Sequence, residues 1–447
     1  MGPDFFTKML DVIGIEAWLD NCLRLTSIAH ETRRVKRKAE RQQPSPPESD
    51  EMEHHTPKKR RMADPNRTPR ATINVPSSSA SSASAASLPA SDHSDAHSRS
   101  SSPKKQMMSL RLDNGGLVCR QLNTDDPPLV AADMVAAFSE IDNSIRILPE
   151  NRKPEIMRIL TEQQLNARLW GSAFTLSGDL DSLPGRVPSW DEVARVRDFA
   201  IQCYDNRHEE ASWNVEVHHR LLESIFRGPT SCQGHPVDFM TCTSARPYRK
   251  YLPYSSSSKM VDLCLYDNTN ADSEALQALA QHTPTLSVNH TDFPPIQLRP
   301  IVLSIETKRP GKELDMAQLQ MGVWHAAQWK FLRSIVAKTA PVERETLVDE
   351  AMSELGYIPG IIIQGHRWLF VFSTMESKTT TTENPHAKTL NKTVLWTEQE
   401  FGSTQSIIKV YQIVAGLREL ARWARDVYMP WYRRRILSAF ANDQQGT

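Results

Sequence analysis

The stretch Leu303-Ser-Ile-Glu-Thr-Lys-Arg-Pro-Gly311 decides the fold class of this 447-residue chain. It continues an apolar, mostly β-branched run that begins at Ile301, which predicts a strand. Strand side chains alternate between two faces, so Glu306 and Lys308 are expected on the same face. The proline and glycine that follow end the strand, and residues Leu314 to Val336 have the apolar stripe of a long helix. The sequence therefore predicts a buried strand that carries two charges and is followed directly by a long helix.

A carboxylate and an ammonium two residues apart in so apolar a strand require an explanation. One explanation is chemical: Glu306 holds a hard divalent cation, and Lys308 orients or deprotonates a water molecule. The other is an ordinary ion pair on a half-solvated strand. These residues by themselves leave both explanations open.

Bulk composition excludes several classes of protein and selects none. Lys+Arg and Asp+Glu are both 53, so the formal charge is zero and does not predict nucleic-acid binding. The six cysteines are scattered without a C-x-x-C pair, which indicates free, mostly buried thiols in a reducing compartment. No apolar run approaches the roughly 20 residues that a membrane span needs, and the N-terminus lacks a secretory signal pattern. We therefore expect a soluble intracellular protein without a membrane partner.

The N-terminal quarter of the chain is expected to be mostly disordered. Residues 31–106 are poor in large apolar side chains, and Ser77 to Ser102 is a Ser/Ala tract typical of a flexible linker. Basic clusters occur at Arg33–Lys38 and at Lys58–Arg61. The alternative is a merely solvated charge run, but two such clusters in a segment that cannot fold favour nuclear import signals. We expect binding to the import machinery and a location in the nucleus.

The pattern along the chain predicts four parts. They are an amphipathic N-terminal helix (1–30), a basic and Ser-rich linker (31–106), a folded domain (107–437) and a tail (438–447). Within the domain, helices are predicted at Ala131–Ile141, Pro154–Leu169, Ser189–Tyr204, His208–Phe226, Ser273–Gln281, Leu314–Val336 and Thr404–Tyr428. Besides the Glu306 strand, the predicted strands are Val237–Cys242, Lys259–Tyr266, a hairpin within Ile358–Phe372, and an edge strand at Val394–Trp396.

Three further polar residues stand out in otherwise apolar elements. Asp262 lies in the predicted strand Lys259–Tyr266, although aspartate is depleted in strands; its alternative is an ordinary strand-start residue. Glu210 falls on the same helix stripe as Trp213, so it is either a site residue or a complement to the helix dipole. Gln318 borders the apolar stripe of the helix that follows Lys308.

Four short motifs in this order resemble the PD-(D/E)XK nuclease superfamily, and more narrowly a fungal group of PD-(D/E)XK nuclease-like proteins. They are EASWNVEVH (Glu210–His218), KMVDL (Lys259–Leu263), IETK (Ile305–Lys308) and AQLQMGVW (Ala317–Trp324). Val261 stands where the superfamily has proline. The gap between Asp262 and Glu306 is long, so Asn268–Pro300 is expected to loop out of the sheet.

The resemblance implies a restriction-endonuclease-like core of class α/β (α+β): a central mixed sheet flanked by helices, with added helices. It implies hydrolysis of phosphodiester bonds with Mg²⁺ or Mn²⁺, and nucleic acid, expected to be DNA, as partner, with no sequence specificity. Asp262, Glu306, Glu210 and the Ile305 carbonyl would hold the metal. Lys308 would position the attacking water, Gln318 would contact the phosphate or a metal-held water, and Arg309 and Lys312 would contact the nucleic-acid backbone.

Two other classes of function remain open at this point. The fold may be retained as a catalytically inactive nuclear module that binds nucleic acid or protein, because fold alone does not fix function. The chain may instead be a regulatory scaffold that works through its linker and N-terminal helix.

Overall fold

The computed structural model describes residues 102–176, 178–228, 235–253, 260–311, 313–339, 345–378 and 390–441. The predicted N-terminal helix, both basic clusters, most of the linker and most of the tail therefore lie outside the described residues, as does Lys312.

A mixed sheet of seven strands forms the centre of the domain, in the order β1-β9-β8-β7-β6-β5-β4. Strands β6 and β7 are parallel, as are β1 and β9, and the other neighbours are antiparallel. The strands are β1 (Leu117–Gln121), β4 (Val237–Thr241), β5 (Leu263–Asp267), β6 (Ile301–Lys308), β7 (Tyr357–Gln364), β8 (Arg367–Lys378) and β9 (Leu390–Ser403). The predicted α/β core with a mixed sheet is confirmed.

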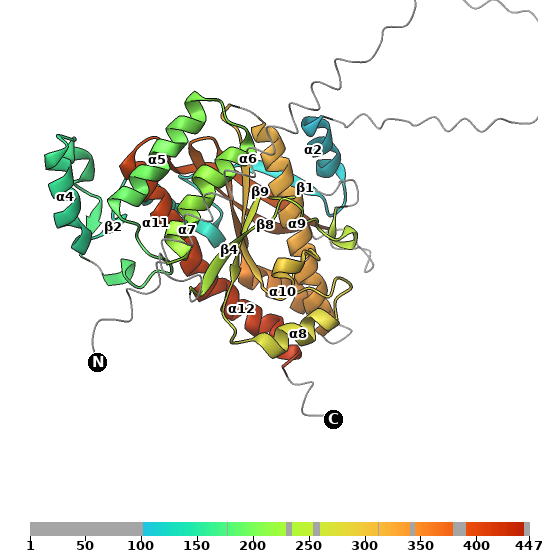
Figure 1. Ribbon diagram of the computed structural model, residues 1–447. Helices are drawn as coiled ribbons and strands as arrows, with labels where there is room; N and C mark the ends of the chain where they lie inside the picture. The colour runs from blue at the N-terminus through green and yellow to red at the C-terminus, as the bar shows by residue number, and fades with distance from the viewer. Residues whose placement is uncertain are drawn as a thin grey trace, which may run out of the picture. The chain divides into compact units, whose positions relative to one another are not determined.

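Helices cover both faces of this sheet (Figure 1). One apolar cluster contains residues of α3, α5, α7 and α11; the second contains residues of α2 and the first half of α9. The helices are α2 (Pro103–Leu112), α3 (Ala132–Asp142), α4 (Lys153–Glu162), α5 (Trp190–Asp205), α6 (Glu210–Trp213), α7 (Arg220–Phe226), α8 (Ser273–Gln281), α9 (Leu314–Thr339), α10 (Glu345–Leu355), α11 (Ile407–Trp423) and α12 (Met429–Arg435). The predicted helix at His208–Phe226 is α6 and α7 joined by a π-helix, Asn214–His219.

Local sequence chemistry places several of these elements where they were expected. Ser189 caps α5 in a capping box, in which its hydroxyl accepts from the Glu192 N–H while the Glu192 carboxylate accepts from the Ser189 N–H. The helix α8 spans the predicted residues. It lies between β5 and β6, so the Asn268–Pro300 insertion does leave the sheet.

Two predictions at the ends of the domain were wrong. Helix α2 begins at Pro103, inside the predicted linker, because Ser102 caps it and proline suits the first helical turn. Strand β9 is a 14-residue strand paired on both sides, not a short edge strand, and β1 takes the edge instead. The apolar triplet Val394–Trp396 marks only its middle, because buried polar residues such as Gln399 continue the strand.

Helix α10 and the start of β5 also differ from expectation. The sequence analysis did not predict α10, an 11-residue amphipathic helix. Strand β5 begins at Leu263, so Asp262 lies directly before the strand instead of within it.

In the residues described, no helix is both long enough and apolar enough to cross a membrane. The cysteines Cys119, Cys203, Cys242 and Cys264 are free thiols, and all but Cys119 are buried.

The domain is expected to lose stability in acid because it buries neutral histidines. Burial lowers the pKa values of His218, His290 and His325 to about 3 each. The unfolded chain therefore binds more protons than the folded domain below pH 6.5, and stability falls as pH drops from about 6.5 towards 3. Each histidine costs about 1.4 kcal/mol per pH unit in that window. Urea unfolding between pH 7.5 and 4.5 measures the slope.

A pair of variants assigns this acid sensitivity to burial. His290→Phe should make the slope shallower, because the His290 ring packs edge-on against Trp324 at 4.4 Å and phenylalanine does not titrate. His282→Phe, at an exposed position, should leave the slope unchanged. Equal slopes in wild type and His290→Phe would contradict the explanation.

Candidate active site

The buried strand β6 ends in two charged side chains. All eight residues of β6 are buried, since β5 and β7 pair with it on both sides. Glu306 is 0% exposed and Lys308 is 7% exposed. Charges so deep in a sheet are expensive unless they are paired, so their partners decide how the site works.

Lys308 places its ammonium among three oxygen atoms. Its Nζ lies 2.6 Å from Oε1 of Glu306, 2.7 Å from the Thr307 carbonyl oxygen and 3.5 Å from Oε1 of Glu210. Glu210 is the first residue of α6, so a helix and a strand 98 positions apart supply the two carboxylates. The expectation that Glu210 faces the β6 residues holds in this geometry.

Asp262 is attached to the end of β6 through the backbone. Its N–H donates to the Ile305 carbonyl at 3.1 Å, and its Oδ2 accepts from both the N–H and the hydroxyl of Thr307 at 2.8 Å each. Leu263 pairs with Ile305, which places the preceding Asp262 beside Glu306. Asp262, Glu306, Glu210 and Lys308 are therefore brought together.

The electrostatics of this cluster show an excess of negative charge. Burial, and then the neighbouring charge of Asp262, raise the pKa of Glu306 well above its usual range despite the Lys308 ammonium. Burial also raises the pKa of Glu210. Burial acts to lower the pKa of Lys308, but the surrounding carboxylates outweigh it and the pKa is raised. Three carboxylates thus share one buried cation.

The comparison with known protein families agrees with this geometry. A model described as the PD-(D/E)XK nuclease superfamily matches residues 158–429, which is more than half of the chain. The chain belongs to this superfamily. Searches of the curated proteins and of the solved structures found no match to this chain. The match includes all four residues of the cluster, whereas α2, β1 and α3 precede it.

Nucleases of the PD-(D/E)XK superfamily typically use divalent metals, so the donors in this chain were compared with that requirement. The Oε2 atom of Glu306 is buried and has no hydrogen-bond partner among the described residues. Together with the carboxylates of Asp262 and Glu210 and the Thr307 carbonyl, it is a hard oxygen donor of the kind that Mg²⁺ and Mn²⁺ prefer. The donor set fits such a cation in kind.

These donors do not form a preorganised metal-binding site. Within the described part of the chain, no group of three or more His, Cys, Asp and Glu side chains is placed to hold a metal ion. The positive charge between Glu306 and Glu210 is the Lys308 ammonium. Metal binding would therefore require these side chains to rearrange around a second cation.

We expected the Ile305 carbonyl to join this donor set, but the carbonyl beside the Lys308 ammonium is that of Thr307. The Ile305 carbonyl accepts the Asp262 N–H within the sheet, whereas the next carbonyl but one, that of Thr307, lies beside the Lys308 ammonium. Thr307 also holds Asp262 through its hydroxyl. Thr307 was not predicted as a site residue, although its position between Glu306 and Lys308 could have indicated that it lies at the site.

Gln318 does not join the carboxylate cluster. Its Nε2 donates to Oε1 of Glu398 in β9 at 3.0 Å, on the exposed side of α9. Gln320 instead donates to the Met260 carbonyl at 3.2 Å, two residues before Asp262. Residues 318 and 320 differ by about 200° around a helix, so their side chains point to nearly opposite sides of α9 and reach different segments of the chain.

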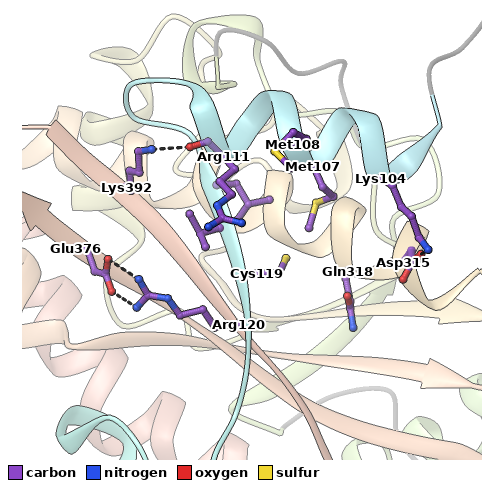
Figure 2. Close-up of a pocket in the computed structure, with 12 residues that line it drawn as sticks. Lys104, Met107, Met108, Arg111, Cys119, Arg120, Asp315, Gln318, Glu376 and Lys392 are labelled. Carbon is purple, nitrogen blue, oxygen red and sulfur yellow. Dashed lines mark hydrogen bonds and ion pairs between the residues drawn. The ribbon is translucent and has the colours of Figure 1, made fainter.

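Gln318 lines a large cavity between α2, β1 and the start of α9 (Figure 2). The cavity has a volume of about 550 Å³. We call it the cationic cavity, because four of its side chains are cations and two are carboxylates: Lys104, Arg111, Arg120 and Lys392, with Asp315 and Glu376. Arg120 pairs with Glu376, whereas no ion pair to Arg111 occurs in the described ranges. The cavity has a net positive charge.

Arg309 follows the carboxylate cluster in the chain and reaches the surface. Its Nη1 lies 3.1 Å from Oε2 of Glu209, and the two side chains are 43% and 77% exposed. Exposed pairs of this kind contribute little to stability, so the guanidinium is available to an incoming anion. The structure does not describe Lys312.

Proposed function

We propose that this PD-(D/E)XK protein is a metal-dependent nuclease that hydrolyses phosphodiester bonds of nucleic acid. The observation that carries the proposal is the convergence of Asp262, Glu306 and Glu210 on Lys308 at the end of β6. The unpartnered Oε2 atom of Glu306 supports it, because a buried carboxylate oxygen is costly without a donor or a cation.

Each residue of the cluster has a role in this proposal. Asp262, Glu306 and the Thr307 carbonyl hold Mg²⁺ or Mn²⁺, with Glu210 completing or hydrogen-bonding the ligand shell. When bound, the cation supplies positive charge to the scissile phosphate and makes water more acidic. Lys308 orients the attacking water through its ammonium protons and stabilises the negative charge that develops on the phosphate.

The same arrangement suggests how nucleic acid binds. Arg309, next to Lys308, and the cationic cavity offer positive charge to a phosphate backbone. No group in the cluster provides a base-specific pattern of donors, so we propose binding without sequence specificity, with DNA as the expected substrate.

We also propose that the protein acts in the nucleus. The basis is the pair of basic clusters at Arg33–Lys38 and Lys58–Arg61. A reporter fused to residues 31–62 should accumulate in nuclei, and replacing the basic residues of both clusters with alanine should abolish that accumulation. A uniformly distributed reporter would refute the assignment.

A non-catalytic nuclease-fold module is the second candidate. It is favoured by the Lys308 ammonium, which takes the place between Glu306 and Glu210 that a metal would need. Such a module would bind nucleic acid without cleaving it.

A cleavage assay separates the two candidates. The full chain is incubated with single-stranded and double-stranded DNA and with RNA, in Mg²⁺, in Mn²⁺ and in EDTA. The nuclease proposal expects cleavage of at least one substrate that requires metal and is lost in Asp262→Asn, since asparagine can keep the hydrogen bonds from Thr307 but not the charge. Binding without cleavage under all conditions would favour the module.

A further inference from the structure

A second cavity adjoins the carboxylate cluster on the side of α5 and α6. It has a volume of about 510 Å³. Its walls include Arg309, which follows Lys308, and Trp213, which lies in the same short helix as Glu210. We call it the aromatic cavity; its relevant side chains are Tyr204, Arg207, His208, Trp213, Arg309 and Pro310. A ligand in this cavity would lie next to the proposed site of cleavage.

An exposed aromatic ring forms part of the wall of the aromatic cavity. Tyr204, near the end of α5, is 53% exposed, which is unusual for so large a ring. One neighbour fixes its position: the His366 ring lies 5.2 Å away, centroid to centroid, at 39°. Trp213 packs edge-on against the same His366 ring at 5.2 Å. Tyr204 is therefore a supported ring with open surface, which suits the stacking of a planar ligand.

Two buried ring nitrogens in the same cavity lack partners. Trp213 is 2% exposed, and its Nε1 has no hydrogen-bond partner among the residues described. The Nδ1 atom of His208 is likewise buried without a partner there. Buried polar groups normally find a partner, so these two nitrogens are an unusual feature of the residues that line this cavity.

Positive charge stands beside these rings. Arg309 pairs with the exposed Glu209, and Arg207 makes no ion pair within the described ranges. These two guanidinium groups outnumber the one carboxylate in the described lining, that of Asp205. A flat ring system with polar edges, joined to an anion, matches the chemistry of a nucleotide. The aromatic cavity thus offers a platform for the base and guanidinium groups for the phosphate.

We propose that the aromatic cavity takes one unpaired nucleobase next to the scissile phosphate, with its ring on Tyr204. The preferred substrate is then single-stranded nucleic acid, or a strand with an extruded nucleotide, because a base within a duplex stack cannot reach such a pocket. This inference rests on the proposed nuclease function and specifies its substrate class.

Equilibrium binding tests the inference. Fluorescence anisotropy measures the Kd of the full chain in EDTA for a single-stranded DNA, an RNA of the same sequence, and the fully paired DNA duplex. Tyr204→Ala should raise the Kd for single strands about tenfold and leave the duplex nearly unchanged. Tyr204→Phe should keep the wild-type Kd, since phenylalanine keeps the ring. The matched control is Tyr248→Ala, at another partly exposed tyrosine that packs on an aromatic ring, Tyr251, outside the cavity.

The outcomes separate this inference from the function on which it rests. If wild type binds nucleic acid but Tyr204→Ala leaves the single-strand Kd unchanged, or Tyr248→Ala raises it equally, the role of the aromatic cavity is refuted and the nuclease proposal stands. If wild type binds none of the three nucleic acids, both fail. Where wild type does bind, the ratio of its Kd values for the DNA and RNA single strands shows which sugar the protein prefers.

Discussion

Lys308→Met is expected to abolish metal-dependent cleavage and to destabilise the metal-free protein by about 3–5 kcal/mol. Activity is lost because the variant lacks the ammonium that orients water and stabilises charge on the phosphate. Stability is lost because the ammonium is the buried cation shared by Glu306 and Glu210. Added Mg²⁺ or Mn²⁺ should raise the melting temperature of this variant more than that of wild type, since the metal no longer competes with the lysine.

The control for this experiment is an exposed lysine outside the carboxylate cluster. Lys330 in α9 donates to the Leu252 carbonyl at 3.2 Å. Lys330→Met should retain cleavage and show no extra response to metal. Wild-type activity in Lys308→Met would exclude the lysine from the mechanism, and an equal metal response in the two lysine variants would refute the competition.

Glu306→Gln should reduce cleavage at least about a hundredfold and weaken metal binding, while the protein still folds. The amide keeps the shape of the side chain but loses the charge that a divalent cation needs. Isothermal titration with Mn²⁺ and a cleavage time course measure the two effects. Unchanged metal affinity would remove Glu306 from the proposed ligand shell.

The same variant should change how stability depends on pH. In wild type the pKa of Glu306 is raised in the folded state above its ordinary value of 4.5, so the folded protein binds more protons than the unfolded chain above that pH. The contribution of this one carboxyl group to wild-type stability is then lost as pH rises from about 4.5, against the opposite trend from the buried histidines. The glutamine does not titrate. Without metal, the free energy of unfolding of the variant should therefore rise relative to that of wild type between pH 4.5 and 7. The missing ion pair adds a constant loss of stability at every pH in this range. Glu209→Gln, at a side chain that is 77% exposed, should show no such trend.

The grouping of Glu306, Lys308 and Glu210 could be predicted from sequence because its anomalies are local. Glu306 and Lys308 interrupt an apolar strand, Glu210 lies on the apolar stripe of its helix, and the order of the elements then resembles one superfamily. Alternation along a strand and periodicity along a helix determine which side chains share a face. Those two rules were enough to bring the three residues together.

The missed features depend on contacts between distant segments. Gln318 faces β9 and not Asp262, because the packing of α9 across the sheet sets the rotation of the helix. The Thr307 carbonyl lies beside the Lys308 ammonium while that of Ile305 accepts the Asp262 N–H, because pairing of the chain before β5 with β6 decides which carbonyls are used within the sheet. The polar ends of β9 are strand because β8 pairs with them, whereas β1 pairs only with the middle, Thr393–Thr397. Local patterns contain none of this information.

The parallel pairing of β1 with β9 has a consequence for biosynthesis. Leu117 is paired with Thr393, so the ribosome must add more than 270 further residues before β1 meets its partner. At about 5–20 residues per second, a nascent chain spends roughly 15–60 seconds with β1 unpaired and, once β8 has emerged, with the edge of that strand open as well. Open edges of this kind pair readily with other chains. Chains whose translation stops before β9 should therefore depend on chaperones to stay out of aggregates.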